Sequence, residues 1–113
     1  IRISNKNYGN LPDYLFSNMT IDQLILNNIH LVSISQYAFY DIKLLKRLQI
    51  NENKLTSLNE LFQSFSSISI EDEKFLNELQ LKKNYLTRLN LVFPPILKNL
   101  IKLDFERNRI VFI

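Results

Sequence analysis

The sequence is poor in the residue types on which most enzyme sites are built. Its 113 residues include no cysteine, one histidine (His30) and one glycine (Gly9). Without cysteine there is no thiol chemistry, and one histidine cannot form a histidine-based metal cluster. One glycine is too few for a glycine-rich phosphate-binding loop. We therefore expect no catalytic residue, no metal site and no cofactor, and predict that the chain is not an enzyme.

Two further absences narrow the choice of partner. No apolar run is long enough to cross a bilayer, so we expect no membrane contact from this segment. The formal net charge is only +3, and composition gives no basic footprint for nucleic acid. Hydrophobic residues make up 46% of the chain, enough for one continuous narrow core. A protein partner is the expectation that remains.

The main positive feature is a spacing that recurs along the chain. Apolar residues follow one another at steps of three and two, then asparagine comes three residues later and another apolar residue two after that. The copies are Leu45, Leu48, Ile50, Asn53, Leu55; Leu76, Leu79, Leu81, Asn84, Leu86; Leu100, Leu103, Phe105, Asn108, Ile110; and, without asparagine, Ile21, Leu24, Leu26, Ile29, Leu31. A fixed period predicts a repeat architecture, and such architectures mostly serve as binding surfaces.

Each position in the spacing has a physical reason. The alternation around Leu48 and Ile50 predicts a short strand with these two side chains inward and Gln49 in solvent. Ile1 and Ile3 occupy the same two inward positions at the start of the chain. The turn after each strand leaves buried backbone groups, which an asparagine side chain can satisfy with two donors and an acceptor. We predict that a structural asparagine ladder is formed by Asn53, Asn84 and Asn108.

This spacing resembles the leucine-rich repeat consensus LxxLxLxxNxL over nearly the whole chain. The steps from Leu26 to Ile50 and from Leu81 to Phe105 are 24 residues, as in the typical subclass of the family. Residues 11–16 and 35–39 are similar to its LPxxaF segment. The resemblance implies an α/β fold, a curved solenoid with a parallel concave β-sheet of about five short strands. Its convex side would consist of loops and short helical or 3₁₀ turns.

In this register the chain divides into consecutive repeats. They are a partial repeat 1–20, repeats 21–44, 45–75 and 76–99, and a partial repeat 100–113. Leu45 and Leu76 are 31 residues apart rather than 24, which implies about seven inserted residues near 63–74. That insertion is either a tolerated surface loop or a projecting contact element. Because both caps are missing, we expect an interior fragment of a longer protein, or the only ordered part of one.

The aromatic residues divide by the same register. Phe39 and Phe62 fall where the family places its buried phenylalanine spine. Tyr37 and Tyr40 flank Phe39, so at least one of them is expected to face solvent. Tyrosine is common at interfaces, but it also packs edge-on over solenoid loops, so both interpretations stay open.

The register also predicts a polar concave face. Its candidate binding residues are Arg47, Gln49, Asn51, Glu78, Gln80, Lys82, Lys83, Lys102, Asp104 and Glu106. If a ligand binds there, Arg47, Lys82 and Lys83 are the expected contacts for acidic groups. The alternative is a solvated sheet face without a ligand, because an aromatic hot-spot cluster is missing from these positions.

Asn18, Met19 and Thr20 form an N-x-[ST] acceptor for N-glycosylation. An occupied site would place the protein outside the cell or at its surface. The resemblance to Toll-like receptor ectodomains and secreted insect immune proteins implies recognition of protein partners in innate immunity, with homo- or hetero-dimers through repeat surfaces. The alternative is an adhesion, matrix or intracellular scaffold protein without an immune role.

Overall fold

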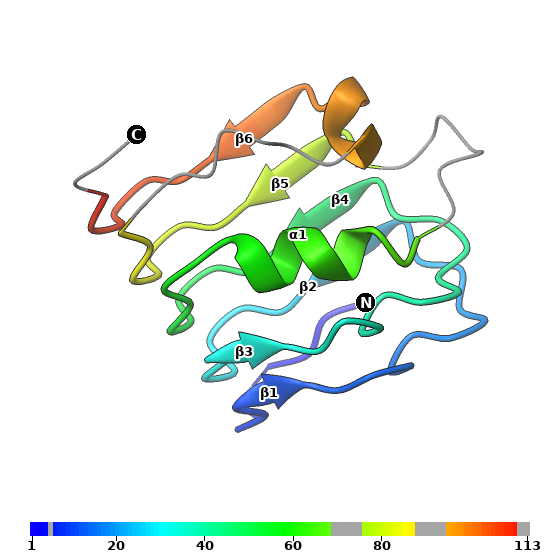
Figure 1. Ribbon diagram of the computed structural model, residues 1–113, viewed down its shortest axis with the longest axis horizontal. Helices are drawn as coiled ribbons and strands as arrows, with labels where there is room; N and C mark the ends of the chain where they lie inside the picture. Colours follow the sequence, from blue (N-terminus) through cyan, green and yellow to red (C-terminus); the bar gives the residue numbers. More distant parts are fainter. Residues whose placement is uncertain (5, 69–75, 88–94, 111–113) are drawn as a thin grey trace.

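The computed structural model describes residues 1–4, 6–68, 76–87 and 95–110. Short elements form two layers around one core, and the chain passes from layer to layer as it advances (Figure 1). The first layer is a four-stranded parallel sheet, here called the main sheet. Its strands in spatial order are β2 (Gln23–Ile25), β4 (Arg47–Gln49), β5 (Glu78–Gln80) and β6 (Lys102–Asp104). The expected α/β class and the parallel sheet are therefore confirmed.

The pairing of the main sheet follows the repeated spacing. The central residues of its strands are partners in the order Leu24, Leu48, Leu79 and Leu103. The first three of these leucines are fully buried. Because the side-chain period of a strand is two, this register places all four leucines on one side of the sheet.

In the described residues the main sheet has four strands, where about five were expected. Arg2 adds only an isolated bridge to Ile25, although backbone bonds continue from the Ile3 N–H to the Ile25 carbonyl (2.9 Å). Ile1 was expected to point into the core, but it is 54% exposed, whereas Ile3 is half-buried. The prediction for Ile1 is therefore wrong, because a side chain at this edge position is covered from one side only.

The second layer contains a small parallel sheet that the sequence did not predict. Its two strands are β1 (Asn10–Leu11) and β3 (Ser33–Ile34). Leu11 and Ile34 are buried against the main sheet's leucines in one hydrophobic cluster. The expectation of only loops and short helical or 3₁₀ turns on this side is thus wrong for these segments. A 3₁₀ turn, η1 (Pro95–Asn99), does precede β6.

The helix α1 (Asn59–Phe65) continues the second layer beyond β3 (Figure 1). The spacing of Leu58, Leu61, Phe62 and Phe65 places them on one face of a helix, and all four are buried. Ile68 is also buried after the helix ends. The interpretation of the insertion as a surface loop is therefore wrong for residues 63–68, since packing this face removes apolar surface from water. Residues 69–74 of that segment lie outside the described residues.

A row of phenylalanines runs along the core. The ring of Phe39 lies 5.9 Å from that of Phe16 and 5.7 Å from that of Phe65, measured between centroids. Phe62 is buried as expected, but it lies beside the row, 6.3 Å from Phe65. Aromatic pairs at such distances add about 0.5–1.5 kcal/mol each beyond their buried area. The helix therefore supplies the third member of the row from residue 65 rather than residue 62.

Candidate functional site: the outer face of the main sheet

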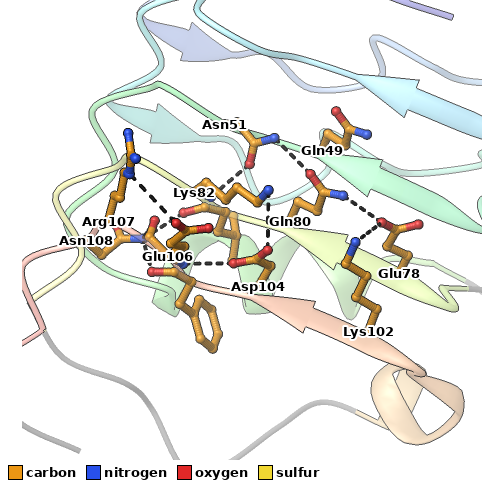
Figure 2. Close-up of polar contacts among 12 residues, drawn as sticks. Gln49, Asn51, Glu78, Gln80, Lys82, Lys102, Asp104, Glu106, Arg107 and Asn108 are labelled. Carbon is orange, nitrogen blue, oxygen red and sulfur yellow. Dashed lines mark hydrogen bonds and ion pairs between the residues drawn. The ribbon is translucent and has the colours of Figure 1, made fainter.

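The side of the main sheet that faces away from the core carries a continuous polar surface, here called the outer sheet face. Residues at alternate strand positions and just after the strands form it (Figure 2). The structure brings together on it all ten candidate binding residues: Arg47, Gln49, Asn51, Glu78, Gln80, Lys82, Lys83, Lys102, Asp104 and Glu106. That they contact a ligand remains a prediction.

Charges on this face are paired from strand to strand. Glu78 in β5 lies between two cations, with Arg47 Nε at 3.9 Å and Lys102 Nζ at 3.4 Å. Arg47 Nη1 also lies 3.4 Å from Asp22, and Lys82 Nζ lies 3.5 Å from Asp104. Such exposed pairs contribute about 0–1 kcal/mol each. Arg47 and Lys82 are nevertheless already paired with acidic groups of the chain itself.

Two carboxylates on the outer sheet face have lowered pKa values. A hydrogen bond from Gln80 Nε2 to Glu78 Oε1 (2.6 Å) lowers the pKa of Glu78 most, followed by the cations Lys102 and Arg47. The backbone N–H of Glu106, bonded to Asp104 Oδ1 at 2.9 Å, lowers the pKa of Asp104 most, followed by Lys82. Hydrogen bonds to a charged carboxylate favour ionisation. Both groups therefore stay negative at neutral pH.

Side-chain amides add a second set of bonds between turns. Asn27 Nδ2 donates to Gln49 Oε1 (3.3 Å), and Asn51 Nδ2 donates to Gln80 Oε1 (3.1 Å). The Oδ1 atom of Asn27 accepts the Asn51 N–H at 2.9 Å. The Oδ1 atom of Asn51 in turn accepts the N–H of Lys82 at 2.8 Å. We call these four amide residues the outer amide chain.

The sequence reasoning treated these amides as free solvent-facing groups and missed this role. The recurrence of asparagine at positions 27 and 51, one period apart, was a signal that could have revealed it. The pattern ends at Lys82, which has no side-chain acceptor to offer. At the next turn Asp104 Oδ1 accepts the Glu106 N–H instead, and Asp104 Oδ2 pairs with Lys82.

The carboxyl ends of the strands border an open groove of about 360 Å³. Its lining is polar throughout and consists of Asn27, Asn51, Glu52, Lys82, Lys83, Glu106 and Arg107. Glu52, Lys83 and Arg107 have φ angles of 59°, 55° and 60°, in the left-handed region. That conformation costs roughly 1–2 kcal/mol per residue for side chains other than glycine or asparagine. Backbone bonds stabilise it, such as that from the Glu52 N–H to the Lys82 carbonyl (2.9 Å).

Beneath the groove, Asn53 satisfies backbone groups of the preceding turn. Its Oδ1 accepts the N–H groups of Ile29 (3.0 Å) and Leu31 (3.1 Å). Its Nδ2 donates to the carbonyls of Leu26 (2.8 Å) and Asn51 (3.0 Å). The side chain is only 3% exposed, so these bonds replace contacts with water.

The two later asparagines repeat this arrangement one turn further on. Asn84 is 3% exposed, and its Oδ1 accepts the Leu55 N–H while its Nδ2 donates to the Ile50 carbonyl (2.8 Å). Asn108 is half-buried and accepts the Leu86 N–H at 3.1 Å. These bonds link each turn to the one before it, and so they position the strands that carry the outer sheet face.

The glycosylation candidate lies away from this face. The side chain of Asn18 is exposed, and its backbone has a φ of 60°. The backbone N–H of Asn18 donates to the Asp41 carbonyl (3.0 Å). The side-chain amide lies in an accessible turn. A bond from Lys43 Nζ is the main cause of a lowered pKa at Asp41. Modification of Asn18 remains a prediction.

Features of other site classes are absent from residues 1–4, 6–68, 76–87 and 95–110. Within them no group of three or more histidine, cysteine or acidic residues could hold a metal ion. In the same residues no helix has the length and apolar character needed to cross a bilayer. The acidic run at 71–73 lies outside them.

Comparisons with protein-family models, with curated proteins and with solved structures find no match to this chain. Assignment to a family therefore depends on the residues themselves, through the spacing of the apolar residues and asparagines.

Proposed function

We propose that this chain is part of a leucine-rich repeat solenoid of the typical, extracellular subclass. The pairing offsets of the main sheet support this proposal, since Leu24 pairs with Leu48 and Leu79 with Leu103, each 24 residues on. The bonds of Asn53 and Asn84 to the preceding turns have the role that the repeat consensus implies. In this proposal the outer sheet face is the concave face.

The function we propose is recognition of a protein partner by the outer sheet face. The observation that carries it is the network of bonds across this polar surface: the outer amide chain and the ion pairs of Glu78 link its side chains before any ligand arrives. Side chains fixed in advance lose less conformational entropy on binding. With alternating charges and no aromatic centre, such a face discriminates by charge pattern more than by apolar burial.

A paired comparison of variants tests the recognition face. We would reverse the charge of Lys82 and Lys102 together (Lys82→Glu, Lys102→Glu) and compare capture of proteins from extracellular fluid with that of the unaltered chain. Lys54→Glu is the matched control, because Lys54 is exposed and lines neither the face nor the groove. A protein retained by the unaltered chain and the control but lost with the double variant supports the proposal. Equal retention by all three would refute recognition through this face.

Glycopeptide mass spectrometry of the natural protein tests the extracellular assignment. A glycan on Asn18 requires passage through the secretory pathway and supports the proposed role in innate immunity, as a receptor ectodomain or secreted protein. A bare Asn18 in a natural protein without disulfide-bonded caps would contradict this assignment and would favour an intracellular scaffold built on the same repeats.

A further inference from the structure

Three tyrosines form an exposed cluster in the turns that follow β1 and β3, here called the tyrosine patch. Tyr14, Tyr37 and Tyr40 are 55%, 39% and 47% exposed. The rings of Tyr14 and Tyr37 are nearly parallel with centroids 6.0 Å apart. The ring of Tyr40 stands perpendicular to both, at 5.6 Å and 6.2 Å. These contacts fix the three rings as one surface that belongs to the second layer, not to the outer sheet face.

The backbone at the centre of the patch is strained. Tyr14 has a φ of 63°, a left-handed conformation that is unusual for a bulky side chain. Bonds from the Tyr14 N–H to the Tyr37 carbonyl (2.9 Å) and from the Ser17 N–H to the Tyr14 carbonyl (3.2 Å) hold it. Asparagine or glycine would fit this position with less strain.

One of the acidic residues near the patch lacks a cation partner. Residues 7–42 contain the aspartates Asp13, Asp22 and Asp41 and no lysine or arginine. Asp22 is paired with Arg47 on the outer sheet face. Asp41 is paired with Lys43 at 2.7 Å. Asp13 Oδ1 accepts the Tyr37 N–H at 2.8 Å, and among the described residues Asp13 has no ion-pair partner. An uncompensated negative charge therefore lies directly beside the rings.

Another tyrosine of the chain, Tyr85, has an arginine over its ring. The guanidinium carbon of Arg109 lies 4.3 Å from the ring centroid of Tyr85. That cation–π contact occupies Tyr85 within the molecule. Among the described residues no cation lies over a ring of the tyrosine patch, although each of its residues is at least as exposed as Tyr85.

We propose that the tyrosine patch is a docking surface for an arginine-bearing segment of a protein partner. Guanidinium groups stack on the faces of Tyr14 and Tyr37, and Asp13 pairs with one of them. Arginine suits this surface better than lysine, because its planar group stacks on aromatic rings and bonds carboxylates with two N–H groups. The proposal is independent of the outer sheet face and adds a second surface to the molecule.

The test is an NMR titration of the full chain with an acetylated, amidated tetra-arginine peptide, and with tetra-lysine for comparison. We expect the ring-proton shifts to be confined to Tyr14, Tyr37 and Tyr40, with Tyr8 and Tyr85 unaffected. Tetra-lysine is expected to bind several-fold more weakly, because an ammonium group neither stacks flat on a ring nor bonds a carboxylate with two N–H groups in a fixed fork.

Two variants separate binding from folding. Tyr14→Asn removes one ring yet suits the left-handed backbone, and is expected to weaken tetra-arginine binding about fivefold. Asp13→Asn keeps an acceptor for the Tyr37 N–H but removes the charge, and is expected to weaken it about threefold. Tyr85→Asn is the matched control and should leave binding unchanged.

Three results would overturn the proposal. One is shifts of equal size at Tyr85 and at the patch, with arginine and lysine peptides binding alike, which would indicate diffuse electrostatics. Another is unchanged affinity in both folded variants, Tyr14→Asn and Asp13→Asn. The third is concentration-dependent self-association of the free chain that Tyr14→Asn abolishes, which would identify a second copy as the occupant.

Discussion

The two layers of the molecule differ in how strictly they repeat. Along the main sheet every turn contributes a three-residue strand with leucine at its centre, from β2 to β6. In the second layer the first two turns contribute the short strands β1 and β3, and the third contributes the helix α1. The turn from Leu45 to Leu76 is 31 residues long, and it is the turn that contributes α1 to the second layer. The strands of the main sheet therefore keep the same length and register, whereas the elements of the second layer change with the length of the turn.

The junction between β3 and α1 shows how the change is accommodated. A third strand would have paired with the edge of β3, whereas backbone carbonyls inside a helix bond to amides of the same helix. Instead Glu60 Oε2, from the first turn of α1, accepts the Ile34 N–H at 2.8 Å. On this edge of β3 one side-chain acceptor takes the place of a neighbouring strand. On the other edge β3 pairs with β1 through Leu11 and Ile34.

The largest expected effect concerns the helix as part of the core. Phe65→Ala removes a fully buried ring that contacts Phe39, and we expect it to lower the free energy of unfolding by about 3–5 kcal/mol. Gln63→Ala, on the exposed side of α1, should change it by less than about 0.5 kcal/mol. Urea denaturation measures both. Equal small losses would mean that the helix is an accessory to the fold rather than part of its core.

A smaller effect distinguishes buried from outer asparagines. Asn84→Ala leaves the Leu55 N–H and the Ile50 carbonyl without partners in a buried site, and should cost about 2–3 kcal/mol of unfolding free energy. Asn51→Ala removes similar bonds from a half-exposed side chain, where water can replace them, and should cost about 1 kcal/mol. Thermal melts of the two variants would contradict this account if Asn51→Ala were the more destabilising.

The closure of the β3 edge should have a local effect. Glu60→Ala removes the acceptor of the Ile34 N–H, and we expect a loss of about 1–2 kcal/mol in unfolding free energy. Hydrogen exchange of that amide should accelerate, while exchange of the Leu48 amide in the main sheet should change only as far as global stability changes. Unaltered protection at Ile34 would show that another group satisfies this edge.

The smallest expected effect is a pH dependence on the outer sheet face. The pKa values of Glu78 and Asp104 are lowered from ordinary values of 4.5 and 3.8, so the unfolded chain binds protons more readily than the folded chain. Their stabilisation is thus fully present above about pH 5 and is lost as pH falls through the lower, folded pKa values. Glu78→Gln should flatten part of this acid limb in urea titrations. An acid limb unchanged by that substitution would exclude Glu78 as a contributor.

The difference between the layers also explains what the sequence could predict. Alternating apolar residues around Leu48 and Leu79 predicted the strands of the main sheet because a strand's side-chain period is local. The pairing of Leu11 with Ile34, and the choice of Phe65 for the aromatic row, depend on how neighbouring turns stack. Local patterns do not carry that information. The insertion was recognised by its length, yet the apolar spacing of three and four at Leu58, Leu61 and Phe65 was the signal for a helix.

For the candidate site, too, the sequence predicted one property and missed another. Alternation placed Gln49, Gln80 and Asp104 on one face, because their orientation follows from the strand alone. Their bonding partners did not follow, since the outer amide chain joins side chains 22 and 29 residues apart. The uncompensated Asp13 beside the tyrosine patch was likewise invisible to a count of total charge, which is positive for the whole chain.

The central claim is that successive turns stack in the register fixed by the repeated spacing. Nuclear Overhauser contacts between strands measure this directly in solution. The account predicts backbone contacts that pair Leu48 with Leu24 on one side and with Leu79 on the other. A register shifted by one residue, with Gln49 opposite Leu79, would turn the polar face inward and contradict the account.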